Sequence, residues 1–219
     1  MGVRRMRLSA SLYAADPLHL AEAATAVTPY VDSLHVDIMD GRFAPAFGFD
    51  ERLVRELIAR GAPPIDIHLM IEQPEQWAPR FAGLGVRSVA FHFEATPDAA
   101  ALATAIRAAG ARAYVALLPE TEPAAVGSIA SAIDGILLLT APPGGGAFID
   151  AAFDRIGRVP TGVSTIVDGR LQPGHFDALR THGVELAVVG AALFNGGMPG
   201  ERARQLDLLA AGGVTAAAD

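Results

Sequence analysis

The segment Ser33–Met39 combines apolar residues with two residue types that can bind metals or move protons. Side chains alternate between the two faces of a strand, so His35, Asp37 and Met39 share one face and the apolar residues between them occupy the other. An imidazole and a carboxylate on one face can ligate a divalent metal or exchange protons with a substrate. Taken alone, His35 is equally well explained as a hydrogen-bonded core residue.

The same residue types recur at two later points. His68 falls within the apolar run Ile65–Ile71, on one face with Met70, and Asp168 ends another apolar run directly before Gly169. A mixed set of nitrogen and oxygen donors suits Zn, Fe(II), Mn or Co better than Mg or Ca. We therefore expect one divalent metal ion to be bound by His35, Asp37, His68 and Asp168.

Eight β-like runs alternate along the chain with eight amphipathic stretches rich in Ala and Leu. The expected strands are Arg7–Tyr13, Ser33–Met39, Ile65–Ile71, Ser88–Glu94, Ala113–Leu118, Gly135–Thr140, Thr165–Asp168 and Leu186–Val189. Alternating strands and helices imply an α/β fold with a parallel sheet, and eight units favour closure into a (β/α)₈ TIM barrel. The expected metal ligands then lie at the C-terminal ends of strands, where the active sites of such barrels lie.

An open, doubly wound sheet is the alternative architecture. It is disfavoured because no Gly-x-Gly-x-x-Gly motif follows the first expected strand. The sequence contains no interdomain linker, so residues 1–219 are expected to form one domain with a loose tail at roughly 212–219. Two prolines and three glycines make Pro142–Gly146 a loop.

The composition excludes several function classes. A net charge of -7 argues against a nucleic-acid partner, because duplex binding requires clustered cations. No apolar run reaches the roughly 20 residues that span a bilayer. The chain has no Cys, which excludes thiolate chemistry and is compatible with the cytoplasm, our expected location. All 17 basic residues are Arg, so Schiff-base chemistry on a lysine is also excluded.

Several segments resemble the ribulose-phosphate 3-epimerase family, including its allulose-phosphate 3-epimerase relatives. The most specific are His35-Val-Asp-Ile-Met-Asp-Gly-Arg-Phe-Ala-Pro45 and Asp66-Ile-His-Leu-Met70. Weaker matches are Ser9-Ala-Ser-Leu12, His92-Phe-Glu-Ala95, Val167-Asp-Gly169 and Val188-Val-Gly190. Together they run in the family's order from about residue 7 to 195.

The resemblance implies a metal-dependent enzyme that inverts C3 of a ketose phosphate. Asp37 and Asp168 match the family's two catalytic aspartates, which move protons on opposite faces of the substrate and also ligate the metal. The intermediate implied is an enediolate, whose negative charge a metal ion stabilises. A homo-oligomer is also expected.

The resemblance further implies substrate contacts. The residues that match family positions near the substrate or its phosphate are Ser11, Met39, Met70, Gly144, Gly145, Gly146, Gly169, Arg170, Gly190 and Ala191. Tight packing explains Ser11 as well, and core packing explains each Met as well. His92 and Glu94 share an inner face on the fourth expected strand, and we interpret them as structural residues or as support for a metal ligand.

The chain departs from the family mainly in the loops that hold phosphate. Thr140–Phe148 is shorter than the family's loop after the sixth strand and lacks its Phe and Gln. Arg170 stands where the family has a second Gly, and Ala191 stands where it has Ser. Backbone N–H donors survive a change from Ser to Ala, and Arg170 could add a charge-assisted contact to phosphate or could simply face solvent. Two expected Asn residues are replaced by Ala46 and Leu118.

Three hypotheses about the function remain. The leading one is a 3-epimerase with D-ribulose 5-phosphate as the default substrate, and allulose 6-phosphate or an unphosphorylated ketose as alternatives. A sugar-phosphate decarboxylase on a similar barrel ranks low, because its Asp-x-Lys-x-x-Asp signature requires Lys. The altered loop leaves open a non-catalytic paralogue that binds a sugar phosphate.

Overall fold

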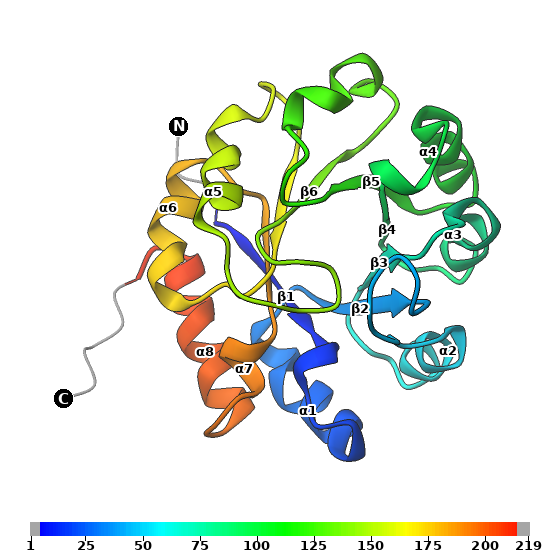
Figure 1. The fold of residues 1–219 in the computed structure, drawn as a ribbon. Coiled ribbons are helices and arrows are strands. Elements are labelled where there is room, and N and C mark those ends of the chain that lie inside the picture. The colour runs from blue at the N-terminus through cyan, green and yellow to red at the C-terminus, as the bar shows by residue number, and fades with distance from the viewer. Residues whose placement is uncertain (1–4, 214–219) are drawn as a thin grey trace.

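The computed structural model describes residues 5–213, which form a closed barrel of eight parallel strands. Each strand pairs with its neighbours in sequence order, and β1 pairs with β8 to close the ring (Figure 1). The strands are β1 (Arg7–Ser11), β2 (Ser33–Met39), β3 (Ile65–Met70), β4 (Ser88–His92), β5 (Arg112–Leu117), β6 (Gly135–Leu139), β7 (Thr165–Asp168) and β8 (Leu186–Val189). The expected (β/α)₈ TIM barrel is confirmed; residues 214–219 of the expected tail lie outside the described residues.

Helices surround the barrel (Figure 1). The α-helices are α1 (Leu20–Val27), α2 (Glu51–Ala59), α3 (Pro74–Ala82), α4 (Ala99–Ala108), α5 (Asp150–Phe153), α6 (Phe176–Thr181), α7 (Ala191–Phe194) and α8 (Pro199–Ala210). Aspartates begin two of them, because Asp50 and Asp98 each accept a hydrogen bond from a backbone N–H in the first turn of α2 and α4.

The expectation of one amphipathic helix after every strand was wrong for the crossover from β5 to β6. That segment forms the 3₁₀-helix η5 (Pro123–Ile129) and no α-helix. Gly127 lies inside it, and glycine is a weak helix former because it loses the most backbone freedom on folding. The next crossover has only the one-turn α5, followed by the 3₁₀-helix η6 (Asp154–Arg158).

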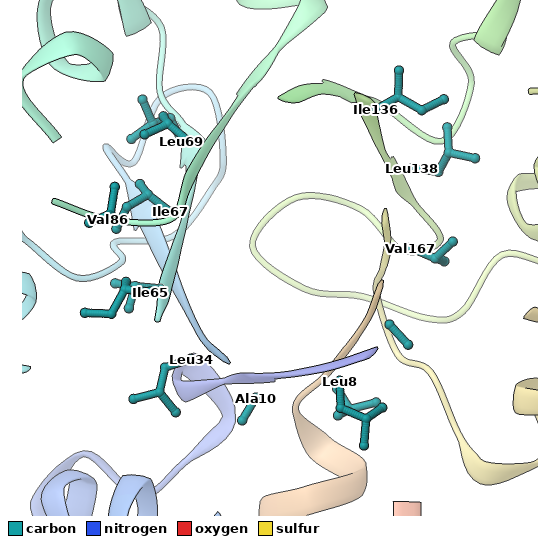
Figure 2. Close-up of a cluster of buried hydrophobic side chains, with 14 of the residues drawn as sticks. Leu8, Ala10, Leu34, Ile65, Ile67, Leu69, Val86, Ile136, Leu138 and Val167 are labelled. Carbon is teal, nitrogen blue, oxygen red and sulfur yellow. The ribbon is translucent and has the colours of Figure 1, made fainter. Parts of the chain in front are cut away.

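The main hydrophobic core lies between the strands and the helices. Apolar side chains of β1, β2, β3, β6 and β7 point away from the barrel's centre toward the helix layer (Figure 2). Because side chains alternate along a strand, the residues between them fill the barrel's interior. On β5 to β8 that interior is apolar, and it includes Tyr114, Leu137 and Ile166.

On β2 to β4 the interior begins with a polar layer at the N-terminal end of the strands. Asp66 accepts hydrogen bonds from Arg87 Nε at 2.9 Å and from Ser88 Oγ at 2.6 Å. Burial opposes ionisation of Asp66, but the bonds and charge of Arg87 lower its pKa. Asp66 is therefore held by hydrogen bonds within this polar layer, although it lies on the same strand face as His68.

Within the described part of the chain, no helix combines the length and the apolar character that crossing a membrane requires.

Candidate metal centre and substrate cavity

Strand register places the predicted metal ligands at one level of the barrel. Parallel pairing sets Asp37 of β2 directly opposite His68 of β3. His35 lies two residues before Asp37 on β2, so both side chains point to the same inner face. Asp168 is the last residue of β7 and pairs with Leu139 of β6 and Val188 of β8. Residues far apart in sequence thus meet at the C-terminal end of the strands.

Each histidine presents one ring nitrogen at a similar distance from one oxygen of each carboxylate. Nε2 of His35 lies 3.3 Å from Oδ1 of Asp37 and 3.5 Å from Oδ2 of Asp168. Nδ1 of His68 lies 3.5 Å and 3.4 Å from the same two oxygens. A tetrahedral ion with bonds of about 2.0–2.2 Å holds its ligand atoms roughly 3.3–3.6 Å apart. These four separations are of the length expected between ligand atoms of one ion, and the four ligand atoms all lie within 4.8 Å of one another.

The two histidine nitrogens that face the carboxylates are otherwise unsatisfied. Within residues 5–213, neither Nε2 of His35 nor Nδ1 of His68 has a hydrogen-bond partner, although both atoms are buried. The side chains are 2% and 0% exposed, so water does not solvate them freely. Buried polar atoms without partners are costly, and a cation between the four donors would satisfy both. The cluster can therefore hold a metal ion.

The electrostatics of the cluster fit the same arrangement. Burial opposes the charged form of His35 and His68, but the two neighbouring carboxylates raise the pKa of both imidazoles above the usual value. Burial likewise opposes ionisation of Asp37 and Asp168, yet the two imidazoles hold both carboxyl pKa values below the usual range. Both carboxylates are thus ionised at neutral pH in the free site. Their negative charge can be balanced either by protons on the two imidazoles or by one divalent cation.

A cavity of about 270 Å³ opens above the cluster. Asp37 and Asp168 line it, whereas His35 and His68 do not and lie beneath its floor. A molecule in the cavity would therefore meet the carboxylates first. The predicted substrate residues that line the cavity are Ser11, Met39, Met70, Gly144, Gly145, Gly169, Arg170, Gly190 and Ala191. Gly146 is not among the lining residues, and a methyl group there would lie 2.8 Å from Cδ of Pro142.

The loop after β6 spans the mouth of the barrel. In Figure 1 this yellow-green segment crosses in front of the strands between β6 and α5. A methyl group on Gly144 would lie 3.2 Å from Cβ of Ala46, so the loop reaches the segment that follows β2. Even with its short length, the loop thus covers one side of the cavity.

Two positions after β7 have unusual backbone conformations. Gly169 has φ 118°, and a methyl group there would lie 2.7 Å from the backbone nitrogen of Ala141. Arg170 has φ 56° and is the one non-glycine residue with positive φ in the described chain. Its guanidinium lies near Gly145 and has no ion-pair partner among residues 5–213. A left-handed Arg costs about 1–2 kcal/mol, and such outliers cluster at functional sites.

Sequence reasoning missed several residues of the cavity. Tyr13 and Ala14 follow β1 in a 3₁₀ turn, and Asn195 follows α7. The expected strand Arg7–Tyr13 was two residues too long, since β1 ends at Ser11. Alternation along the expected strand would have placed Tyr13 on the face of Ser11, whereas Ala14 and Asn195 lie on no strand face and could not be identified in this way. Ala141 and Pro142 were recognised as part of a loop, but their place in the lining depends on how that loop folds back.

His92 and Glu94 lie behind the cluster and not in the cavity. Nε2 of His92 is 3.0 Å from Nε2 of His68, and Nδ1 of His92 is 3.3 Å from Oε2 of Glu94. Burial lowers the pKa of His92 to about 4, so this ring is neutral. The geometry agrees with the interpretation that these two residues support a metal ligand.

Comparison with known proteins places the chain among sugar-phosphate epimerases. The model of the ribulose-phosphate 3 epimerase family matches residues 7–194. The chain is 34% identical over 201 residues to the ribulose-phosphate 3-epimerase of Mycobacterium leprae, which covers 88% of this chain and 89% of that protein. It is 30% identical over 207 residues to the ribulose-phosphate 3-epimerase of Treponema pallidum, with coverages of 88% and 93%.

Solved structures with lower identity share the fold. The KGPDC of Streptococcus mutans in complex with D-R5P superposes with a TM-score of 0.76 at 16% identity, covering 94% of this chain and 98% of that chain. The 3-hexulose-6-phosphate synthase of Salmonella typhimurium superposes with a TM-score of 0.72 at 16% identity, with the same coverages. At this identity the likeness extends to the barrel alone.

Proposed function

The chain belongs to the ribulose-phosphate 3-epimerase family, a family of isomerases, and we propose that it inverts the configuration at C3 of a ketose phosphate. The observation that carries this proposal is the meeting of Asp37 and Asp168 at the floor of one cavity. The two residues come from β2 and β7, which are not neighbours in the barrel. Carboxylates from two sides of one floor suit a reaction that needs proton transfer on both faces of a carbon.

Epimerisation breaks the C3–H bond on one face of the substrate and forms a new one on the other. One aspartate accepts the C3 proton, and the electron pair moves toward the C2 carbonyl oxygen, which gives an enediolate. The other aspartate must carry a proton when the turnover begins, although its pKa in the free site is lowered, and it donates that proton to the opposite face of C3. After the turnover the two carboxyl groups have exchanged protonation states, and solvent resets them. Substrate protons should therefore exchange with solvent.

We propose that His35, Asp37, His68 and Asp168 hold one divalent ion of zinc, iron(II), manganese or cobalt. Such an ion supplies positive charge that stabilises the enediolate and acidifies the C3–H bond. The lowered pKa values of Asp37 and Asp168 make them weak bases. A weak base suffices where it lies within reach of an acidified proton. Ser11 donates a hydrogen bond of 2.9 Å to Oδ2 of Asp37 and so helps to orient that carboxylate.

Part of the cavity lining suits the phosphate group. It consists of three loop segments rich in glycine, namely Gly144–Gly145, Gly169–Arg170 and Gly190–Ala191. Glycine lets the backbone N–H groups approach an anion closely. Arg170 adds a guanidinium with no ion-pair partner in the described chain, which can bind phosphate oxygens directly. Met39 and Met70, which pair at the ends of β2 and β3, add an apolar part to the lining.

D-ribulose 5-phosphate is the proposed substrate, because the curated relatives carry the name ribulose-phosphate 3-epimerase. Allulose 6-phosphate or an unphosphorylated ketose is the second candidate, and the altered loop after β6 favours it. A homo-oligomeric assembly and a cytoplasmic location stay predictions.

A deuterium-exchange screen by NMR tests the proposal. The purified protein is incubated in D₂O with ribulose 5-phosphate, allulose 6-phosphate and the two free sugars. We expect fastest loss of the C3 proton signal with ribulose 5-phosphate, together with the appearance of xylulose 5-phosphate. Exchange confined to the free sugars would contradict the phosphate assignment. No exchange with any sugar, in protein that retains its metal, would contradict the epimerase and support a binding paralogue.

A further inference from the structure

The two histidines of the cluster are held in different ways. Nδ1 of His35 has no hydrogen-bond partner within residues 5–213. The outward nitrogen of His68, Nε2, instead contacts Nε2 of His92 at 3.0 Å. That contact continues through Glu94 into the loop after β5. Of the two histidines, His68 is thus the one that a series of side-chain contacts connects to the loop after β5.

The geometry points to Glu94 and His92 as positioning residues that set the tautomer of His68 and thereby the metal affinity of the site. This inference rests on the proposed metal centre. A neutral His68 that ligates through Nδ1 must carry its proton on Nε2. A single proton bridges the two Nε2 atoms, so Nε2 of His92 must accept it. His92 then carries its own proton on Nδ1, where it can donate only to Glu94, 3.3 Å away.

Glu94 can serve as the terminal acceptor because its other oxygen is held by two donors. Oε1 of Glu94 accepts from the backbone N–H of Leu118 at 3.0 Å and from the hydroxyl of Thr121. Both contacts require an oxygen at that position. Leu118 contributes a backbone group, so the replacement of the family's Asn by Leu118 leaves this contact unchanged.

The loop that supplies these donors is itself fixed by a buried arginine. Arg155 is 2% exposed, and its Nη1 donates to the carbonyl of Leu118 at 2.8 Å and also to the carbonyl of Thr121. Its Nη2 donates to the carbonyl of Leu139 at 2.9 Å. The donors of Glu94 thus belong to a rigid turn. No α-helix follows β5 in this crossover, and the first residues after β5 are instead held by their hydrogen bonds to Arg155.

Glu94→Gln tests the inference because an amide cannot replace both carboxylate oxygens. If the amide oxygen faces His92, the NH₂ group opposes the N–H of Leu118. If the amide is flipped, its NH₂ group donates to Nδ1 of His92, and His92 must then donate through Nε2 to His68. That second arrangement moves the His68 proton to Nδ1, the ligating atom. Either outcome weakens the metal site without changing a ligand.

We expect Glu94→Gln to lower Zn²⁺ affinity by about 10–100-fold in competition with a chromophoric chelator. Thr121→Val, which keeps the shape and removes the hydroxyl, should lower it less, and Thr121→Ser should restore it. Glu122→Gln is the matched control, since Glu122 is exposed on the same loop and, among residues 5–213, forms its ion pair with Arg158 alone. Exposed pairs contribute little, so we expect affinity within about twofold of wild type.

The tautomer itself is measured by ¹⁵N NMR of the histidine rings in the Zn²⁺-loaded protein. Wild type should show His92 protonated on Nδ1 and His68 on Nε2, and Glu94→Gln should lose that pattern. Wild-type protein that binds no Zn²⁺ would contradict the proposed metal centre. Wild-type binding with equal affinity and unchanged ring signals in Glu94→Gln would overturn the positioning role alone.

Discussion

The proposed metal cluster and the loops proposed to bind phosphate occupy the same rim of the barrel but are built on different principles. The cluster consists of three buried side chains on β2 and β3 and the partly exposed Asp168 on β7, all positioned by strand pairing. The loops after β6, β7 and β8 are positioned by backbone conformations, several of them with positive φ. Strand pairing tolerates little variation, whereas loops accept insertions and replacements. We therefore expect chemistry to depend on the cluster and substrate choice on the loops.

The largest expected effect comes from the two aspartates. Asp37→Asn and Asp168→Asn should each reduce exchange of the C3 proton at least about 10³-fold, because each change removes a proton-transfer group and a metal ligand. NMR in D₂O measures the exchange. Asp98→Asn is the matched control, since Asp98 caps α4 outside the cavity and Asn caps helices equally well. Wild-type exchange in either cluster variant would contradict the two-base mechanism.

The pH dependence of metal binding should separate the cluster from the loops further. His35 and His68 have raised pKa values in the metal-free protein, so protons compete with the metal below those values. Metal affinity should be highest at alkaline pH. As the pH is lowered, affinity should already decline before pH 6.5 is reached, by up to about 100-fold per pH unit if both imidazoles take up protons. Asp37 and Asp168, with lowered pKa values, and His92, with a pKa of about 4, should add no slope there.

Chelator competition with Zn²⁺ between pH 6 and 8.5 measures this slope. His19→Asn should leave it unchanged, because His19 is exposed and pairs with Asp16 away from the cavity. An affinity that stays flat down to pH 6 would show that the two imidazoles do not exchange protons for metal.

A moderate effect is expected from Arg170. Arg170→Ala should raise KM for the ketose phosphate about 10–100-fold, the loss expected for one charged hydrogen-bond donor. The kcat and the KM for an unphosphorylated ketose should change little. Arg42→Ala provides a control, because Arg42 is exposed at the same rim and pairs with Glu72. Equal losses for the phosphorylated and free sugars would assign Arg170 to another role.

The smallest effect should follow the loss of one neutral hydrogen bond within the cluster. Ser11→Ala removes the 2.9 Å bond to Asp37, which contributes about 0.5–1.5 kcal/mol, so kcat should fall about 10-fold or less. Ser11→Thr keeps the hydroxyl and should retain more activity if its methyl group fits. A loss as large as that of Asp37→Asn would mean that Ser11 touches the reacting atoms.

Much of the site could be predicted because its residues follow simple periodicity. His35 and Asp37 alternate with apolar residues on β2, and His68 does so on β3, so the inward face could be read from the sequence. Asp66 shares the face of His68 and could not be distinguished by the same logic. Its role depends on Arg87, which lies at the start of the next strand and reaches it only in the folded barrel.

The loops could be predicted only as loops. The glycines of Pro142–Gly146 indicate flexibility in φ, but not that Gly144 reaches Ala46 or that Gly144 and Gly145 line the cavity whereas Gly146 does not. The β5–β6 crossover was expected to form an amphipathic α-helix and instead forms a 3₁₀-helix, and contacts of Arg155 with backbone carbonyls hold the residues before it. Such contacts depend on long-range packing and leave no periodic signal.

The amino-acid sequence by itself determined the alternation of strands and helices, the inward face of each strand and the donor types at the rim. These properties are local, since they follow from the spacing of side chains along one strand. Tertiary structure alone decided which inward residues lie close enough together to hold an ion, which inward residue is hydrogen-bonded elsewhere, and how His68 is connected to Glu94. Those outcomes depend on barrel closure, because only closure brings atoms from distant strands within 3–4 Å of one another.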